Sequence, residues 1–235
     1  MATKTGEERE SSVNEAGSAA EKVRREPLTR ERVVHTALEI MDREGVEALT
    51  MRRVGRELGV EAMSLYNHVR DKEDLLDAIT AAVMAEFVWE ATTDDWVEQG
   101  RRAAREWRRL LKAHPQVIQL LVERKHPMDS PDMLRPTEIA LDLLRRAGLS
   151  ERDTVNAFQA IGGYIFGLVM MEIGNVAPGR PGEGEVVDLA HQVPADEFPC
   201  LAQMLPWFVQ CDMDATFELG LDLLLEGVRA KAEAS

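Results

Sequence analysis

Cysteines and long apolar runs are scarce in this chain, and each scarcity argues against a class of protein. Only two cysteines, Cys200 and Cys211, occur among 235 residues. We expect reduced thiols, with a redox pair as the weaker alternative, rather than a disulfide framework or a metal site. The longest apolar run, residues 161–173, contains three glycines and is shorter than the roughly 18 residues that cross a bilayer. Because no charged-then-apolar signal pattern opens the chain, we expect a cytoplasmic protein without a membrane partner.

Acidic side chains outnumber basic ones, but they are unevenly distributed. The net charge is −14 at pH 7, yet residues 28–72 carry eight basic and eight acidic side chains. Residues 73–235 carry 15 basic and 28 acidic side chains, and hold most of the negative charge. Salt screens exposed charges beyond about 10 Å. The charge balance therefore permits a polyanionic partner for the neutral segment, although it does not by itself support one.

Apolar residues recur at helical spacing through most of the chain, and capping residues mark where helices begin. Thr29, Thr50, Asp71 and Ser150 precede such stretches, and Gly59 follows one of them. The sequence shows no alternating strand pattern of useful length and no internal repeat, so the expected fold class is all-α. The expected helices cover residues 29–44, 51–58, 61–68, 72–90, 95–113, 117–123, 135–147, 150–173, 198–205 and 212–230.

Two segments have the composition of irregular chain. Residues 1–27 are rich in Glu, Ser, Ala and Lys and end at Pro27. Such a segment buries too little apolar surface to offset the entropy of ordering it, which predicts a disordered tail. Residues 174–194 are rich in Gly and Pro, which predicts a mobile loop between two helices.

Residues 49–76 contain the most informative pattern, two short helices joined by a turn at Gly59. This arrangement is a helix-turn-helix. Small side chains at the start of its second helix would let the backbone approach base edges in the major groove of DNA. Tyr66 could offer its hydroxyl to a phosphate, and Lys72 could offer charge and nearby backbone N–H groups to another. The alternatives are ordinary packing for Tyr66 and a solvated cap position for Lys72.

The same segment resembles the DNA-binding domain of the tetracycline repressor (TetR) family over residues 29–76. The resemblance rests on Gly59-Val60, Leu65-Tyr66, His68-Val69, Lys72, Leu75-Leu76, Thr50-Met51-Arg52 and Tyr66-Asn67-His68-Val69. It implies phosphate contacts by Thr50, Met51, Tyr66 and Lys72. It also implies base-reading or base-adjacent positions at Arg52, Ala62, Met63, Ser64 and Asn67, with His68 facing the DNA backbone. Arg52 is the strongest candidate for guanine, because its planar fork can bond O6 and N7 together.

The C-terminal part is similar to the tetracycline-repressor type of C-terminal domain at residues 110–115, 147–150 and 163–167. This similarity implies a homodimer in which helices 150–173 and 212–230 of two copies form a four-helix bundle. Both helices are apolar around a wide face, which indicates burial on several sides. A simple monomeric core is the alternative. We therefore expect a tail (1–27), a DNA-binding domain (28–76) and an effector-binding and dimerisation domain (77–235).

A ligand site in the C-terminal domain is less well marked. Apolar, aromatic and methionine residues could line a cavity, since Met adapts to varied ligands, but the same residues could simply form core. The candidates are Trp107, Leu111, Met133, Ile139, Phe158, Met170 and Met171. His114 and His126 invite comparison with the magnesium–drug chelate of tetracycline repressors, but no companion ligands align with them, so we expect no metal and no cofactor. Five arginines between residues 101 and 109 are expected to form a solvated face, with pairing to nearby acids as a further option.

Together these features predict a one-component transcriptional regulator. The resemblance implies a dimer that holds double-stranded operator DNA and releases it when a small-molecule effector enters the C-terminal domain, with repression as the family default. Helix 72–90 would be the lever between the two sites. An enzyme is disfavoured because the sequence contains no nucleophile elbow, phosphate loop or metal motif. Arg52, Tyr66 and Lys72 argue against a ligand-binding module that has lost its DNA.

Overall fold

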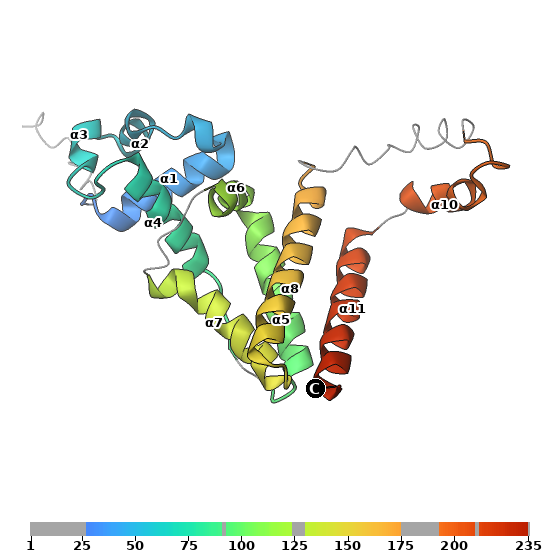
Figure 1. The fold of residues 1–235 in the computed structure, drawn as a ribbon. Coiled ribbons are helices and arrows are strands. Elements are labelled where there is room, and N and C mark those ends of the chain that lie inside the picture. Colours follow the sequence, from blue (N-terminus) through green and yellow to red (C-terminus); the bar gives the residue numbers. More distant parts are fainter. Residues whose placement is uncertain (1–26, 91–92, 124–129, 175–192, 210–211, 235) are drawn as a thin grey trace, which may run out of the picture.

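The computed structural model describes residues 27–90, 93–123, 130–174, 193–209 and 212–234. All regular secondary structure in these ranges is helical (Figure 1), which confirms the expected all-α class. Residues 1–26 of the predicted tail, residues 175–192 of the predicted loop, His126 and Cys211 lie outside the described residues. The elements are α1 (Arg30–Glu44), a 3-10 turn η1 (Val46–Ala48), α2 (Met51–Leu58), α3 (Ala62–Leu65), α4 (Lys72–Ala85), α5 (Trp96–Ala113), α6 (Pro115–Glu123), α7 (Pro131–Arg146), α8 (Glu151–Glu172), α10 (Pro199–Val209) and α11 (Met213–Glu233).

The predicted caps begin their helices as expected. The hydroxyl oxygens of Thr29 and Thr50 accept hydrogen bonds from backbone N–H groups three residues ahead, at 3.2 and 3.1 Å. Asp71 and Ser150 do the same for α4 and α8, at 2.8 and 3.2 Å. Each cap satisfies a backbone donor that has no partner within the helix. These local bonds explain why four helix starts could be located from sequence.

Two predicted helices are shorter than expected. α4 ends at Ala85 rather than near residue 90, because the chain turns so that Phe87, only 7% exposed, packs into the core. α3 is regular only over Ala62–Leu65, instead of extending to residue 68. The N–H of His68 bonds the carbonyl of Leu65 at 2.8 Å, three residues back, so the chain tightens into turns.

α7 begins four residues earlier than predicted. Ser130 is its cap and accepts a hydrogen bond from the N–H of Met133 at 3.3 Å, and Pro131 takes the first helical position. Proline suits that position because its missing N–H would have no helical partner there. A Ser-Pro pair followed by an apolar stretch was thus a readable start signal. α11 extends to Glu233, three residues past its expected end.

The first four helices form one end of the molecule, which we call the head (α1–α4). Their buried side chains make a core that includes Ile40, Val54, Leu65 and Ile79, each fully buried. The same cluster also takes in residues of α5 and α6. Figure 1 shows α4 running out of the head towards α7, and α4 packs against both α6 and α7. The head is therefore joined to the rest of the chain through α4.

The remaining long helices form the body (α5, α7, α8 and α11). α8 lies beside α5, α7 and α11 (Figure 1). The hydroxyl of Tyr164 on α8 donates to the backbone carbonyls of Thr216 and Phe217 on α11, at 2.9 and 3.0 Å. The Tyr164 ring packs directly against Gly220, where a Cβ atom would overlap it. Gly220 is thus needed for close contact between these two helices.

α8 leaves much of its apolar surface uncovered. Over an 18-residue window its mean hydropathy is 1.3, so by length and composition it could cross a membrane, and only 22% of that window is buried. The apolar run 161–173 in the sequence analysis is shorter than this window, because the window also includes polar residues that precede residue 161. Val155 and Met171 are each 51% exposed, and Gly163 and Gly167 lie on the exposed surface between them. This exposed apolar face of α8 is a surface that could be covered by another apolar surface.

Candidate nucleic-acid interface and effector cavity

Two glycines shape the turn between α2 and α3. Gly59 adopts the left-handed conformation, with φ 67° and ψ 33°, which costs little only without a Cβ atom. Gly55 allows close approach, because a Cβ atom on it would lie 2.9 Å from the carbonyl oxygen of Val60 and 3.2 Å from the N atom of Ala62. The N–H of Val60 in turn bonds the carbonyl of Gly55 at 2.9 Å. The tight turn confirms the predicted helix-turn-helix.

None of the side chains predicted to contact DNA is buried. Met63 is 72% exposed and Tyr66 is 45% exposed, so Tyr66 lies outside the core, and its phosphate contact stays a prediction beside the alternative of ordinary half-buried packing. The other exposed members are Thr50, Arg52, Asn67 and Lys72, and the half-buried ones are Met51, Ala62, Ser64 and His68. Leu65 and Val69, which alternate with them, are buried. The structure therefore brings the whole predicted set to the surface of α2, α3 and the start of α4.

Ion pairs hold the turn between α3 and α4 against α1. The guanidinium of Arg30 donates to the carbonyl of His68 at 2.6 Å and pairs with Asp74 at 3.0 Å. Asp74 also accepts a hydrogen bond from the N–H of Arg70 at 2.8 Å. The hydrogen bond with Arg30, reinforced by the Arg70 N–H, lowers the pKa of Asp74 to about 2. This contact fixes the backbone beside His68 and Lys72, where phosphate contacts are predicted.

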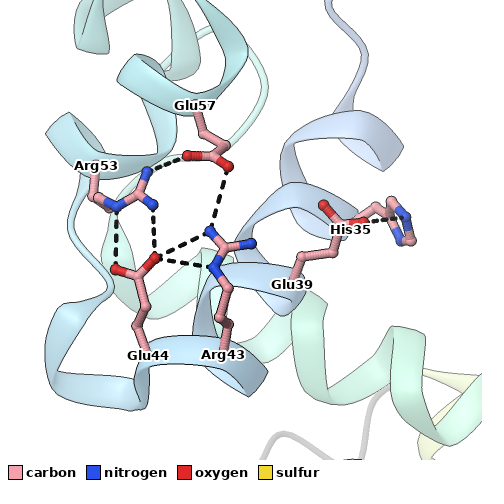
Figure 2. A network of polar contacts seen from close by, with 6 residues as sticks. All are labelled: His35, Glu39, Arg43, Glu44, Arg53 and Glu57. Atoms are coloured by element: carbon pink, nitrogen blue, oxygen red, sulfur yellow. Dashed lines mark hydrogen bonds and ion pairs between the residues drawn. The ribbon is translucent and has the colours of Figure 1, made fainter.

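A second polar network joins the end of α1 to α2. Figure 2 shows Arg53 between Glu44 and Glu57, with Arg43 bonding the same two carboxylates. Hydrogen bonds to Arg53 lower the pKa of both Glu44 and Glu57. Arg53 is thus occupied within the protein, whereas Arg52 beside it is exposed. The Arg53–Glu57 spacing of four residues was a readable signal for part of this network.

The body contains a cavity of about 370 Å³. Of the predicted ligand residues, Trp107, Met133, Ile139 and Phe158 line it, and three others do not. Leu111 is buried in the adjoining core, Met170 is half-buried against that core, and Met171 is 51% exposed. The cavity follows α8 only from Phe158 to Phe166, so residues further along that helix cannot reach it. The described residues that line it are Met84, Phe87, Trp96, Gly100, Ala103, Ala104, Trp107, Leu121, Met133, Pro136, Thr137, Ile139, Ala140, Leu143, Leu144, Phe158, Ile161, Gly162, Ile165, Phe166, Leu221 and Leu225.

Trp107 is the aromatic centre of this lining. Its ring meets Phe87 edge-to-face at 6.1 Å between centroids and Phe166 at 6.0 Å, both at 73°. The indole packs against the head core on one side and the body core on the other. The sequence analysis named neither Phe87 nor Phe166 as a cavity residue, because the expected helix 72–90 continued through Phe87 and residues 163–167 were used only for the family resemblance. A ligand against Trp107 would touch a group that both cores share.

His114 lies at the joint between head and body. Its Nδ1 is 2.8 Å from a carboxylate oxygen of Asp42 on α1, and its Nε2 is 3.3 Å from one of Glu86 after α4. His114 is not among the cavity-lining residues. Among the described residues no group of three or more His, Cys, Asp or Glu side chains has the arrangement of a metal site. His114 therefore connects helices instead of facing a ligand in the cavity.

The expected solvated arginine face is wrong for Arg108, whose side chain is 11% exposed. It pairs with Glu172 of α8 and, at 2.7 Å, with Asp214, and its guanidinium carbon lies 4.6 Å from the Phe217 ring centroid. Burial lowers the pKa of Arg108, but hydrogen bonds to Glu172 and Asp214 outweigh that effect and raise it above the ordinary value. Lys112 adds a second cation 2.7 Å from Glu172. These opposite charges neutralise one another at the contact of α5 with α8 and α11, although the Glu172 oxygen nearest Lys112 accepts no well-aligned hydrogen bond.

Comparisons with known proteins agree with this arrangement. Residues 33–79 match the family described as bacterial regulatory proteins, tetR family, and residues 90–232 match the tetracyclin repressor-like C-terminal domain. The HTH-type transcriptional repressor DrrR1 of Streptomyces coeruleorubidus is 33% identical over 86% of this chain and 77% of its own. The class A tetracycline repressor from transposon 1721 of Escherichia coli is 31% identical over 83% of this chain and 88% of its own. Apo ActR of Streptomyces coelicolor superimposes with a TM-score of 0.74 at 31% identity, covering 89% of this chain and 99% of ActR. ActR bound to actinorhodin gives 0.72 at 30% identity, covering 88% and 99%.

Proposed function

The chain belongs to the TetR family of bacterial transcriptional regulators, and from this premise we propose that it is a cytoplasmic repressor released from its operator by a small molecule. In this proposal residues 28–76 hold DNA, and residues 77–235 bind the effector and a second copy of the chain. One observation carries it. α4 begins at exposed Lys72, on the predicted DNA surface, and its other end supplies Met84 and the adjoining Phe87 to the cavity. The family is one of transcriptional regulators, not of enzymes.

The DNA-reading role is assigned to the exposed surface of α2 and α3. Arg52 is exposed at the start of α2 and available for guanine, whereas its neighbour Arg53 is bound to Glu44 and Glu57. Thr50, Met51, Tyr66 and Lys72 would contact phosphates on either side, which sets the register of the reading helix on the duplex. Ala62, Met63, Ser64 and Asn67 would lie nearest the base edges, and His68 would face the backbone.

The switch is a shift between two conformers of α4. An effector in the cavity would press on Met84 and Phe87, and so favour a position of α4 that misplaces Lys72 and α3. A ligand can shift this equilibrium only by its difference in affinity for the two conformers. The joint of His114 with Asp42 and Glu86 lies beside the cavity end of α4. That joint is where the head would turn relative to the body.

The second copy would cover the exposed apolar faces of α8 and α11. Leu219 and Leu223 on α11 are 63% and 67% exposed, and the glycines of the exposed α8 stripe would let a second helix approach closely. A monomer would leave these side chains in water. Two copies related by a two-fold axis would also present two reading helices to a palindromic operator, about one helical turn apart.

The DNA proposal is tested by binding of the purified protein to the DNA that flanks its own coding region, at two salt concentrations. We expect tight, salt-sensitive and sequence-selective binding. Arg52→Ala should weaken it by roughly tenfold or more, the value of one good bidentate base contact, and Tyr66→Phe should weaken it less. Arg109→Ala is the control, because that arginine is exposed on α5 and pairs with Glu106. Equal, weak binding of all duplexes by the wild type and Arg52→Ala would overturn the proposal.

The dimer proposal is tested by sedimentation of the Leu223→Glu variant. Placing two carboxylates in an apolar interface should convert the dimer to a monomer that keeps its helical circular dichroism signal. Leu134→Glu is the control, because Leu134 is 42% exposed on α7, outside the proposed interface. A Leu223→Glu protein that remains dimeric would place the interface elsewhere.

A further inference from the structure

The part of the cavity wall that the structure describes carries no ionisable side chain. Its residues come from α4 and the turn just after it, and from α5, α6, α7, α8 and α11, and they include no Asp, Glu, Lys, Arg or His. The hydroxyl group among these described residues belongs to Thr137, and the ring N–H groups belong to Trp96 and Trp107. In a chain with 30% charged residues, this composition describes a site selective against charge. We propose, building on the effector role of this cavity, that its ligand is an uncharged, flat, polycyclic aromatic molecule bound without a metal ion.

Aromatic side chains are concentrated around the cavity. The chain has only 4 Trp, 2 Tyr and 6 Phe, yet Phe87, Trp96, Trp107, Phe158 and Phe166 all line this one space. Rings prefer to stack with an offset or to meet edge-to-face, and such pairs gain about 0.5–1.5 kcal/mol beyond the burial of their area. A flat aromatic ligand can make both kinds of contact with these rings. A saturated ligand of the same size cannot.

Three arginines of α5, a helix that supplies several lining residues, are paired with acids that do not belong to the lining. On α5, Arg101 pairs with Asp222 at 2.7 Å and Arg105 with Glu218 at 2.7 Å. Arg108 is held by Glu172 and Asp214, as described above. Among the described lining residues none can act as a counter-ion to a charged ligand, and an isolated charge in an apolar environment is strongly disfavoured. The same reasoning disfavours a metal chelate, because the described lining contains no carboxylate, imidazole or thiolate group.

Small residues provide the space between the rings. Gly100, Ala103 and Ala104 line the α5 side, Ala140 the α7 side and Gly162 the α8 side. A Cβ atom on Gly162 would meet no other atom within 4 Å, so open space adjoins this position. Because Gly162 itself lines the cavity, a larger side chain at this position is expected to extend into its space. This gives a substitution that fills the site while the helix is kept.

The test uses two pairs of probes on the full-length protein without DNA. N-phenyl-1-naphthylamine is neutral, and 8-anilinonaphthalene-1-sulfonate has the same rings with one added sulfonate; binding of each is followed by its fluorescence. Phenanthrene and its saturated analogue perhydrophenanthrene are then compared as competitors of the neutral probe. We expect the neutral probe to bind at least about tenfold more tightly than the sulfonate, and phenanthrene to compete at least about tenfold better than perhydrophenanthrene. EDTA and added Mg²⁺ should leave both Kd values unchanged.

Variants place the binding in this cavity. Gly162→Leu should weaken the neutral probe at least tenfold, whereas Gly162→Ala, which shares the loss of glycine but leaves most of the space, should stay within threefold of the wild type. A preference below tenfold in either probe pair, a dependence on Mg²⁺, or unchanged binding by Gly162→Leu would overturn the proposal. Operator binding is measured separately, so a protein that binds these probes but no operator DNA would refute the repressor function while leaving the ligand class intact.

Discussion

The head and the body of this molecule are built in opposite ways. The head buries Val33, Leu49, Val54, Leu65 and Leu75 completely, and its ion pairs lie near the surface. The body surrounds a cavity with apolar and aromatic side chains, and buries an arginine between three of its helices. A closely packed interior resists deformation because any movement creates voids or overlaps. The head is thus suited to present a fixed surface, and the body to change shape when a ligand fills it.

α4 belongs to both regions and shows how they are connected. Leu75 and Ile79 are fully buried in the head core, while Met84 near its other end lines the cavity. The helix is a single rigid element of 14 residues. A movement of α4 at its cavity end must therefore also move the part of α4 that is packed in the head. Substitutions confined to the head or to the body should therefore have different effects on stability, on DNA binding and on ligand binding.

The largest effect is expected from Arg108→Leu in the body. The substitution removes the main counter-ion of Glu172, whose side chain is 6% exposed, and leaves only Lys112 beside it. Removing one partner of a buried ion pair is strongly destabilising because the other charge stays buried. We expect the free energy of unfolding to fall by about 3 kcal/mol, measured by urea denaturation followed by circular dichroism.

The neighbouring arginine provides the control. Arg109 is 53% exposed and pairs with Glu106 on the same helix, so Arg109→Leu should change the free energy of unfolding by no more than about 0.5 kcal/mol. Equal losses for the two variants would show that the Arg108 cluster is not a buried ion pair in solution. The contrast between the solvated ion pairs of the head and the buried Arg108–Glu172 pair of the body would then be wrong.

Replacing a helical glycine by alanine should have a smaller effect on stability than Arg108→Leu. The change should destabilise the protein in the head and stabilise it in the body. In the head, Gly55→Ala puts a Cβ atom 2.9 Å from the Val60 carbonyl oxygen, and such overpacking costs about 2 kcal/mol and should displace α3 enough to weaken operator binding. In the body, Gly162→Ala meets open space and should stabilise the protein by about 0.5–1 kcal/mol, because glycine loses more backbone entropy on folding. Thermal unfolding and operator binding of both variants measure these effects. Destabilisation by both alanines would contradict the distinction between a solid head and a hollow body.

The features that could be predicted from sequence depend on neighbouring residues along the chain. The caps at Thr29, Thr50, Asp71 and Ser150 each bond an N–H three residues ahead, and the turn at Gly59 needs only its own backbone angles. The structure places buried Leu65 and Val69 among the exposed residues of the helix-turn-helix surface. The residues of that surface were assigned mainly from the family resemblance, and their roles in DNA contact stay predictions.

The features that could not be predicted depend on contacts distant in sequence. Arg108 is buried because Glu172 and Asp214 meet it from α8 and α11, and its own helix gives no sign of this. Met170 and Met171 have the composition of a ligand site, but the cavity ends at Phe166, where α8 packs against other helices. Phe87 reaches the cavity because α4 stops early. In each case the packing of helices that are distant in sequence decided whether a residue was buried, exposed or facing the cavity.

A modest effect that should depend on pH is expected from Asp74→Asn in the head. Asp74 has a pKa of about 2 in the folded protein, against an ordinary value of 3.8, so folding favours its ionised form. The resulting stability is present above pH 4 and is lost as pH falls from about 4 to 2. Its partner Arg30 is 48% exposed, so solvent screening reduces the contribution to about 1 kcal/mol at neutral pH.

Urea denaturation of the wild type and Asp74→Asn at pH 7, 5, 4 and 3 measures this contribution. The two proteins should differ by a constant amount from pH 7 to 5 and should converge as the wild-type carboxylate binds a proton at lower pH. Asp142→Asn is the control, because Asp142 is a carboxylate in the body that pairs with Arg145 and Arg146 on its own helix and ties no two helices together. A difference that grows on acidification would mean that Asp74 is stabilised in its protonated form, and that the Arg30 contact does not fix the α3–α4 turn. A difference that narrows, together with weaker operator binding by Asp74→Asn at pH 7, would show that the head depends on this surface ion pair to hold His68 and Lys72 in place.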